Sequence, residues 1–122
     1  MSKLRVATLS LGLAAIVVLA WAVPAFAHQT GTTVTVTAGK PGPFSFTLST
    51  TSVKHGTVTF NVKNGGTGLT HDFQINGKKT PMLKPGKSAT LTVTFSKAGS
   101  YPYQCTVPGH AAAGMKGTLK VT

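Results

Sequence analysis

The segment "GTVTFNVK" at residues 56–63 alternates between apolar side chains and polar or small ones. A period of two is typical of a β-strand with one face on a core and the other in water. The same alternation recurs before and after this segment, and clusters of turn-forming Gly, Pro, Asn and Lys separate the repeats. The alternating segments cover residues 32–38, 44–50, 57–63, 71–75, 89–95, 101–105 and 117–122.

This pattern, without any helical period between the segments, predicts an all-β fold. We expect an antiparallel β-sandwich or barrel of about seven to eight strands. No tryptophan occurs after residue 27, so the core has to be built from smaller apolar side chains. The expected core residues are Phe44, Phe46, Leu48, Val58, Phe60, Val62, Phe73, Ile75, Leu91, Val93, Phe95, Leu119 and Val121.

The first 27 residues are typical of an export signal. Two basic residues precede an apolar run at residues 6–23, and an A-x-A pattern ends at Ala27. We predict cleavage after Ala27, which leaves one small domain over residues 28–122. The alternative is an uncleaved membrane anchor, although the apolar run is short and interrupted. Both alternatives place the domain outside the cytoplasm, in the periplasm or at the cell surface.

The charge after residue 27 is strongly positive, with ten lysines against one acid, Asp72, a formal +9. Such a charge favours acidic redox partners, or an anionic membrane or cell surface. We expect no nucleic-acid binding, because the lysines are dispersed and arginine, the usual base reader, is absent from this region. A single carboxylate also excludes paired acid–base catalysis and oxygen cages for hard metals, so we expect no enzyme.

The single cysteine, Cys105, cannot form an internal disulfide, so in an exported domain it is buried, reactive or metal-bound. It ends the predicted strand at residues 101–105, five residues before His110 and ten before Met115. Thiolate, imidazole and thioether are soft or borderline ligands and exclude magnesium and calcium. Cysteine, two histidines and a long axial methionine form the blue-copper arrangement, which requires a second histidine.

Three histidines compete for that second position. His55 lies in a turn and is expected to be an exposed side chain. His28 would begin the mature chain, where its amine and ring together offer a copper chelate. His71 opens a predicted strand directly after a glycine-rich loop, a position from which a side chain reaches the cysteine loop. We therefore favour His71.

Two segments carry a family resemblance. "GTVTFNVKNGGTGLTHDFQI" at residues 56–75, followed by "GSYPYQCTVPGHAAAGMKGTLKV" at residues 99–121, resembles the small blue-copper proteins, the cupredoxins of plastocyanin, azurin and halocyanin type. The resemblance implies a Greek-key cupredoxin sandwich that is monomeric, holds one type 1 copper ion and transfers single electrons. The ligands that it implies are His71, Cys105 and His110 in the equatorial positions and Met115 as the weak axial one.

The resemblance also implies roles for neighbouring residues. Asp72 would tie the histidine loop to the backbone near Thr106. A separate hypothesis follows from charge and not from the resemblance: as the only acid in the chain, Asp72 would offset charge near the metal and lower the reduction potential. Electrons would leave through the edge of His110, which is set in a small apolar surface that Met82 would extend.

The same residues are compatible with three other functions. An exported copper carrier or buffer would use the same ligands, although such sites are commonly richer in methionine than this chain. A Cys–His nucleophile would lack an orienting group other than Asp72. A metal-free adhesion domain would make the cysteine, histidine and methionine coincidental neighbours.

Overall fold

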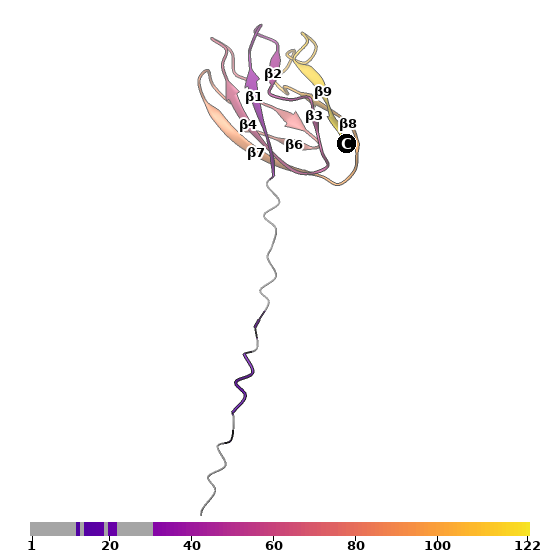
Figure 1. Ribbon diagram of the computed structural model, residues 1–122. Coiled ribbons are helices and arrows are strands. Elements are labelled where there is room, and N and C mark those ends of the chain that lie inside the picture. The colour runs from indigo at the N-terminus through magenta and orange to yellow at the C-terminus, as the bar shows by residue number, and fades with distance from the viewer. Residues whose placement is uncertain (1–11, 13, 19, 22–30) are drawn as a thin grey trace, which may run out of the picture.

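The computed structural model describes residues 12, 14–18, 20–21 and 31–122. The described residues form nine strands, which are arranged in two sheets (Figure 1). The first sheet has the order β2-β1-β4-β7 and the second has the order β3-β9-β8-β5-β6. The bounds are β1 (Thr32–Ala38), β2 (Phe46–Leu48), β3 (Ser52–Val53), β4 (Gly56–Asn64), β5 (Gln74–Ile75), β6 (Lys78–Lys79), β7 (Ser88–Phe95), β8 (Gly99–Gln104) and β9 (Lys116–Val121).

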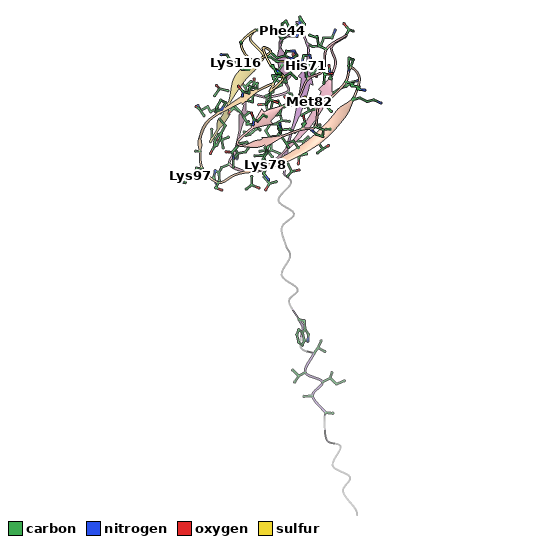
Figure 2. The ribbon with its side chains drawn as sticks, turned by 180° about the vertical axis from the view of Figure 1, so that it is seen from behind. Phe44, His71, Lys78, Met82, Lys97 and Lys116 are labelled. Carbon is green, nitrogen blue, oxygen red and sulfur yellow. The ribbon has the colours of Figure 1, made fainter. Side chains whose placement is uncertain are left out.

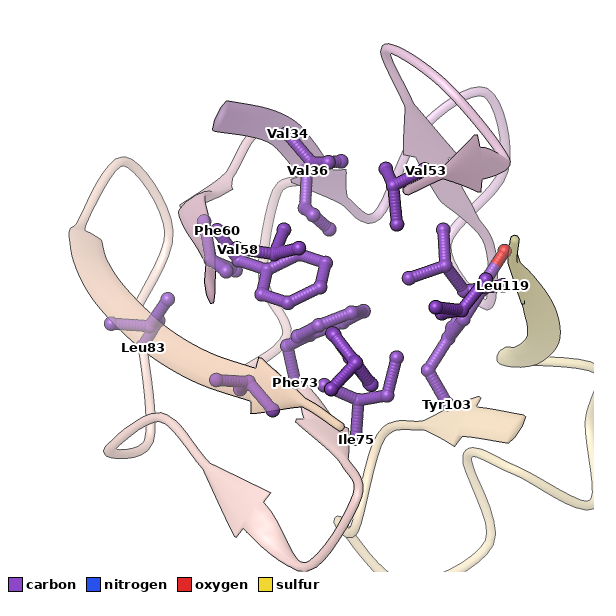
Figure 3. Packing of buried hydrophobic residues seen from close by; sticks show 14 residues of the cluster. Val34, Val36, Val53, Val58, Phe60, Phe73, Ile75, Leu83, Tyr103 and Leu119 are labelled. Carbon is purple, nitrogen blue, oxygen red and sulfur yellow. The ribbon is translucent and has the colours of Figure 1, made fainter. Parts of the chain in front are cut away.

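The two sheets pack face to face, which confirms the predicted all-β sandwich. Apolar side chains from both sheets meet between them, with Phe60 and Phe73 at the centre (Figure 3). The centroids of these two rings lie 5.3 Å apart. Nine of the thirteen expected core residues are buried, whereas four are only half-buried: Phe44, Phe46, Leu48 and Leu91. The structure also buries Val34 and Val36 of β1, because that strand lies inside the first sheet.

Most strand pairs are antiparallel, as expected, but two pairs are parallel. β1 and β4 are parallel in a register that pairs Val34 with Phe60, and β3 and β9 are parallel as well. Alternation is the same in parallel and antiparallel strands, so the pattern cannot reveal direction. The connection between the strands sets their relative direction. Between β1 and β4 the chain passes through β3 of the other sheet, and it then runs again in the direction of β1.

The predicted number of strands was slightly too low, and one predicted strand is mostly loop. β3 and β6 have two residues each, too few for alternation to reveal. Within the expected strand at residues 71–75, only Gln74–Ile75 is strand. His71 instead forms an isolated bridge with Leu83. This leaves His71 at the end of the sandwich.

Gly117 of β9 leaves room for the ring of Tyr103. The two residues are paired between β8 and β9, and a Cβ on Gly117 would lie 2.5 Å from Cζ of Tyr103. Gly117→Ala is therefore expected to lower the free energy of unfolding of the metal-free protein by about 1–3 kcal/mol. Chemical denaturation measures this, with the exposed neighbour Thr118→Ala as control. Equal stability of Gly117→Ala and the wild type would contradict the prediction.

The predicted export signal is largely outside the described residues. These include neither Ala27, where cleavage is predicted, nor His28. Across the residues that are described, there is no helix with the length and apolarity needed to cross a membrane.

Candidate metal centre

The predicted ligands gather at one end of the sandwich. Figure 2 shows Phe44 and His71 near this end, whereas Lys78 and Lys97 lie at the opposite end. Three segments that are distant in sequence meet here: the loop after β4, the loop between β8 and β9, and the segment around Leu83. A site at this end therefore depends on the tertiary fold.

His71 is held by its backbone. Its N–H donates to the carbonyl oxygen of Leu83 at 3.0 Å, and the N–H of Leu83 donates back to the carbonyl oxygen of His71 at 2.7 Å. The glycine-rich loop of residues 65–70 brings the chain from β4 to this bridge. The imidazole is buried, and its ring lies 5.0 Å from that of His110.

Cys105 and Met115 close the loop that joins β8 to β9. The N–H of Cys105 donates to the carbonyl oxygen of Met115 at 3.1 Å, and the N–H of Met115 donates to the carbonyl oxygen of His110 at 3.0 Å. Gly114, with φ of 116°, allows the last turn before Met115, a backbone conformation that favours glycine. These bonds fix three predicted ligands on one compact loop.

The donor atoms form a small triangle. The Nδ1 atoms of His71 and His110 are 3.2 Å apart, and Sγ of Cys105 lies 4.0 Å and 3.6 Å from them respectively. Three atoms at these separations share a centre about 2.1 Å from each, close to the metal–nitrogen and metal–sulfur distances of about 2.0 and 2.3 Å in N/S metal sites. The residues therefore fit a metal ion bound by two nitrogens and one sulfur.

Met115 is fully buried beside this triangle. It packs with Cys105 and Ala38 in a small cluster, which Phe44 and Val107 border. A thioether in this position is chemically suited to a soft metal ion and unsuited to calcium or magnesium. The cluster also keeps water from the sulfur atoms.

Burial sets the protonation of the metal-free site. It raises the pKa of the Cys105 thiol, so the thiol stays neutral until a metal displaces its proton. Burial also lowers the pKa of His71, the facing His110 lowers it further, and Asp72 opposes both effects. The imidazole of His71 is thereby kept in the neutral form that a metal ion requires.

Asp72 links the two ligand loops, as the family resemblance implies. Its Oδ1 accepts a hydrogen bond from the N–H of Thr106 at 2.6 Å, and its Oδ2 accepts another from the hydroxyl of the same residue. The carboxylate is fully buried. The residue after His71 is thus tied to the residue after Cys105.

The other candidate ligands lie elsewhere. His55 is exposed, and its Nδ1 lies 3.0 Å from the carbonyl oxygen of Thr122. Met82 is 52% exposed and adjoins Leu83, which leaves Met115 as the methionine that packs against Cys105.

Two residues at this end were not predicted as part of a site. Phe44 was expected in the main core, but its ring meets that of His110 edge-on at 5.1 Å. Asn64 lies just beyond the predicted strand at residues 57–63, but it is the last residue of β4 and is fully buried. Its signal in the sequence is that it continues the inward series of Val58, Phe60 and Val62 with a polar side chain.

Comparison with known proteins points to one family. A family model described as a cupredoxin-like domain matches residues 10–121. The crystal structure of dithionite-reduced auracyanin from the photosynthetic bacterium Roseiflexus castenholzii superposes with a TM-score of 0.64. It is 25% identical to this chain, and the match covers 75% of this chain and 98% of that one.

Two curated relatives match over shorter segments. Auracyanin-B of Chloroflexus aurantiacus is 54% identical over 43 residues, which are 35% of this chain and 18% of that protein. The copper-resistant cuproprotein CopI of Pseudomonas aeruginosa is 52% identical over 40 residues, which are 33% of this chain and 22% of that protein. The chain thus matches only about a fifth of the length of these relatives.

Proposed function

Because the chain belongs to the cupredoxin-like family, we propose that it binds one copper ion and carries single electrons outside the cytoplasm. The observation that carries this proposal is the triangle of two imidazole nitrogens and one thiol sulfur, whose common centre suits a metal ion. The proposed ligands are His71, Cys105 and His110, with Met115 as the weak fourth ligand. CopI, a cuproprotein by name, and an auracyanin crystallised in a reduced form support copper and redox chemistry.

The chain's own residues are suited to electron transfer. Copper, when bound, supplies a Cu(I)/Cu(II) couple that accepts and releases one electron. Cys105, His110 and Met115 sit on one hydrogen-bonded loop, and Asp72 ties this loop to the residue after His71. Because the frame is fixed, little has to rearrange between oxidation states. Four protein ligands leave no open position for a substrate, so we propose an electron carrier and not an enzyme.

His110 is the proposed exit for the electron. It is 9% exposed, whereas His71 and Cys105 are 1% exposed and Met115 is fully buried. Pro108 and Ala112 next to it are exposed and apolar, which suits brief contact with a partner. Of the four proposed ligands, His110 is thus the most exposed, and its edge is the proposed contact with a partner.

The proposed partners are acidic redox proteins. Asp72 is the single acid of the described region and is buried, so none of the residues described there exposes a side-chain carboxylate, while lysines are exposed around the domain. Such a surface speeds encounter with an acidic partner and permits contact with an anionic cell surface. We propose that the protein acts as an exported monomer after cleavage at Ala27.

A copper carrier or buffer is the second candidate, and the local similarity to CopI favours it. The two functions differ in how the metal is held. An electron carrier keeps its copper ion through many cycles of oxidation and reduction, whereas a copper carrier passes Cu(I) to an acceptor protein. Adding Cu(II) to the purified metal-free protein, then cycling it with a reductant and an oxidant, separates them.

The proposal predicts that one equivalent of Cu(II) binds and gives intense visible absorption. This absorption should bleach with reductant and return with oxidant, while a competing Cu(I) chelator removes little metal. Colourless bound Cu(I) that passes readily to the chelator would favour the copper-delivery function over electron transfer. Absence of copper binding would contradict both functions.

Replacing Met115 with leucine is expected to keep copper bound and to change its reduction potential. The volumes are similar, so the metal-free protein should lose less than about 1.5 kcal/mol of stability. The potential should shift because a weakly bound methionine sulfur would tune the potential of such a copper site. Voltammetry measures the shift, and the exposed Met82→Leu is the matched control. An identical potential in both variants would contradict an axial role for Met115.

A further inference from the structure

Asn64 is a polar residue in an apolar row. It is the last residue of β4 and is fully buried, and the preceding inward residues of this strand are apolar. Its Nδ2 donates to the carbonyl oxygens of Leu69 and Leu83, each at 2.8 Å. Its Oδ1 accepts from the N–H of Gly66 at 3.0 Å. A buried amide is costly unless it is bonded in this way, and here every side-chain polar atom has a partner.

Two of these partners lie on either side of His71. Leu69 precedes it by two residues in the chain, and Leu83 faces it across the isolated bridge. The carbonyl oxygen of Leu83 accepts from both Nδ2 of Asn64 and the backbone N–H of His71. One side-chain amide thus fixes the segment that leads into His71 and the segment that holds its backbone.

The third partner belongs to the loop near the outer edge of the imidazole. A Cβ on Gly39 would lie 2.9 Å from Cα of Gly66 and 3.2 Å from Nε2 of His71. Gly39 therefore packs against both the loop and the ring. By holding the N–H of Gly66, Asn64 also holds this loop in place.

We propose that Asn64 is a positioning residue for His71, and that it acts independently of Asp72. Asn64 fixes the backbone before and beside His71, whereas Asp72 ties the residue after it to the cysteine loop. Without Asn64 the fold keeps Cys105 and His110 in place, but Nδ1 of His71 loses its fixed distance from them. This inference rests on the proposed function, because it assigns His71 to the metal.

The test compares Asn64→Asp with Asn61→Asp. Both changes add the same charge to β4, and Asn61 is exposed, with Oδ1 as the acceptor for the hydroxyl of Thr90. An aspartate at position 64 loses both N–H donors and faces two carbonyl oxygens. We expect its Cu(II) affinity to fall about 10- to 100-fold, the cost of losing an outer partner of a metal ligand.

The readouts separate positioning from stability. Visible absorption and reduction potential of the copper-loaded Asn64→Asp protein should shift, while Asn61→Asp should match the wild type. If Asn64→Asp is less stable but keeps the affinity, spectrum and potential of Asn61→Asp, the positioning role is wrong. Failure of the wild type to bind Cu(II) would instead overturn the proposed function, and this inference with it.

Amide exchange in the metal-free wild type provides a test that does not depend on the variant folding. The side-chain NH2 protons of Asn64 and the backbone N–H of His71 should exchange slowly, in contrast to the side-chain NH2 protons of Asn61. Exchange as rapid as that of Asn61 would overturn the proposal. Asn64→Ser, which keeps one donor, should bind Cu(II) with an affinity between those of Asn64→Asp and the wild type.

Discussion

Cys105→Ser is expected to abolish the intense visible absorption of the copper-loaded protein and to weaken Cu(II) binding. The affinity for Cu(II) should fall more than it does when a hydrogen-bond partner of a ligand is removed, which costs about 10- to 100-fold. Serine is nearly the same size, so the loop keeps its shape. Its hydroxyl is a hard donor that does not replace a thiolate toward copper. Titration with Cu(II), followed by absorption, measures both effects.

The control for this prediction is His55→Ala. His55 is exposed, and its Nδ1 contacts the carbonyl oxygen of Thr122, which lies outside the ligand loops. This variant should bind copper as the wild type does. Unfolding of metal-free Cys105→Ser, compared with that of the wild type, shows whether the fold is intact. A well-folded Cys105→Ser protein that still gives the intense absorption would show that the Cys105 thiolate is not a copper ligand.

Asp72→Ala is expected to destabilise the metal-free protein by about 2–4 kcal/mol. The carboxylate is fully buried and accepts two hydrogen bonds from Thr106, and bonds to charged groups contribute about 1.5–3 kcal/mol each. Alanine leaves the N–H of Thr106 without its partner. Because the two ligand loops are no longer tied, copper binding should weaken as well. Chemical denaturation and Cu(II) titration measure the two effects.

Asp72→Asn separates the hydrogen bonds from the charge. Its carbonyl oxygen still accepts from the N–H of Thr106, and its amide donates to the hydroxyl, so stability should stay within about 1 kcal/mol of the wild type. The reduction potential should rise, because a negative charge near the metal favours the oxidised form. An unchanged reduction potential and an unchanged spectrum would contradict the role of the Asp72 charge in the site.

Much of the site could be predicted because its chemistry is carried by rare residues. Cys105 has no disulfide partner, and His110 and Met115 follow it on the same loop. The loop before His71 is rich in glycine, which marks a close approach of backbones, and Gly66 does pack against Gly39. The alternation of apolar residues likewise predicted the sandwich and most of its core.

The remaining features depend on tertiary contacts that a local pattern does not contain. Parallel pairing of β1 with β4 follows from a crossover into the second sheet. Phe44 belongs to an alternating segment, yet its ring packs on His110 because the loop before β2 folds over the site. Asn64 lies just outside the alternating segment at residues 57–63, and its place at the site follows from its hydrogen bonds to Leu69 and Leu83.

X-ray absorption spectroscopy of the copper-loaded protein in both oxidation states tests the central claim most directly. We predict two nitrogen ligands and one strongly bound sulfur ligand, that of Cys105, at nearly unchanged distances in Cu(II) and Cu(I), with Met115 as a weaker sulfur ligand in both states. The loop of Cys105 and His110 and the bridge of His71 hold the donors in place. Loss of a histidine or a change in the number of ligands on reduction would contradict a fixed electron-transfer site and favour a copper carrier.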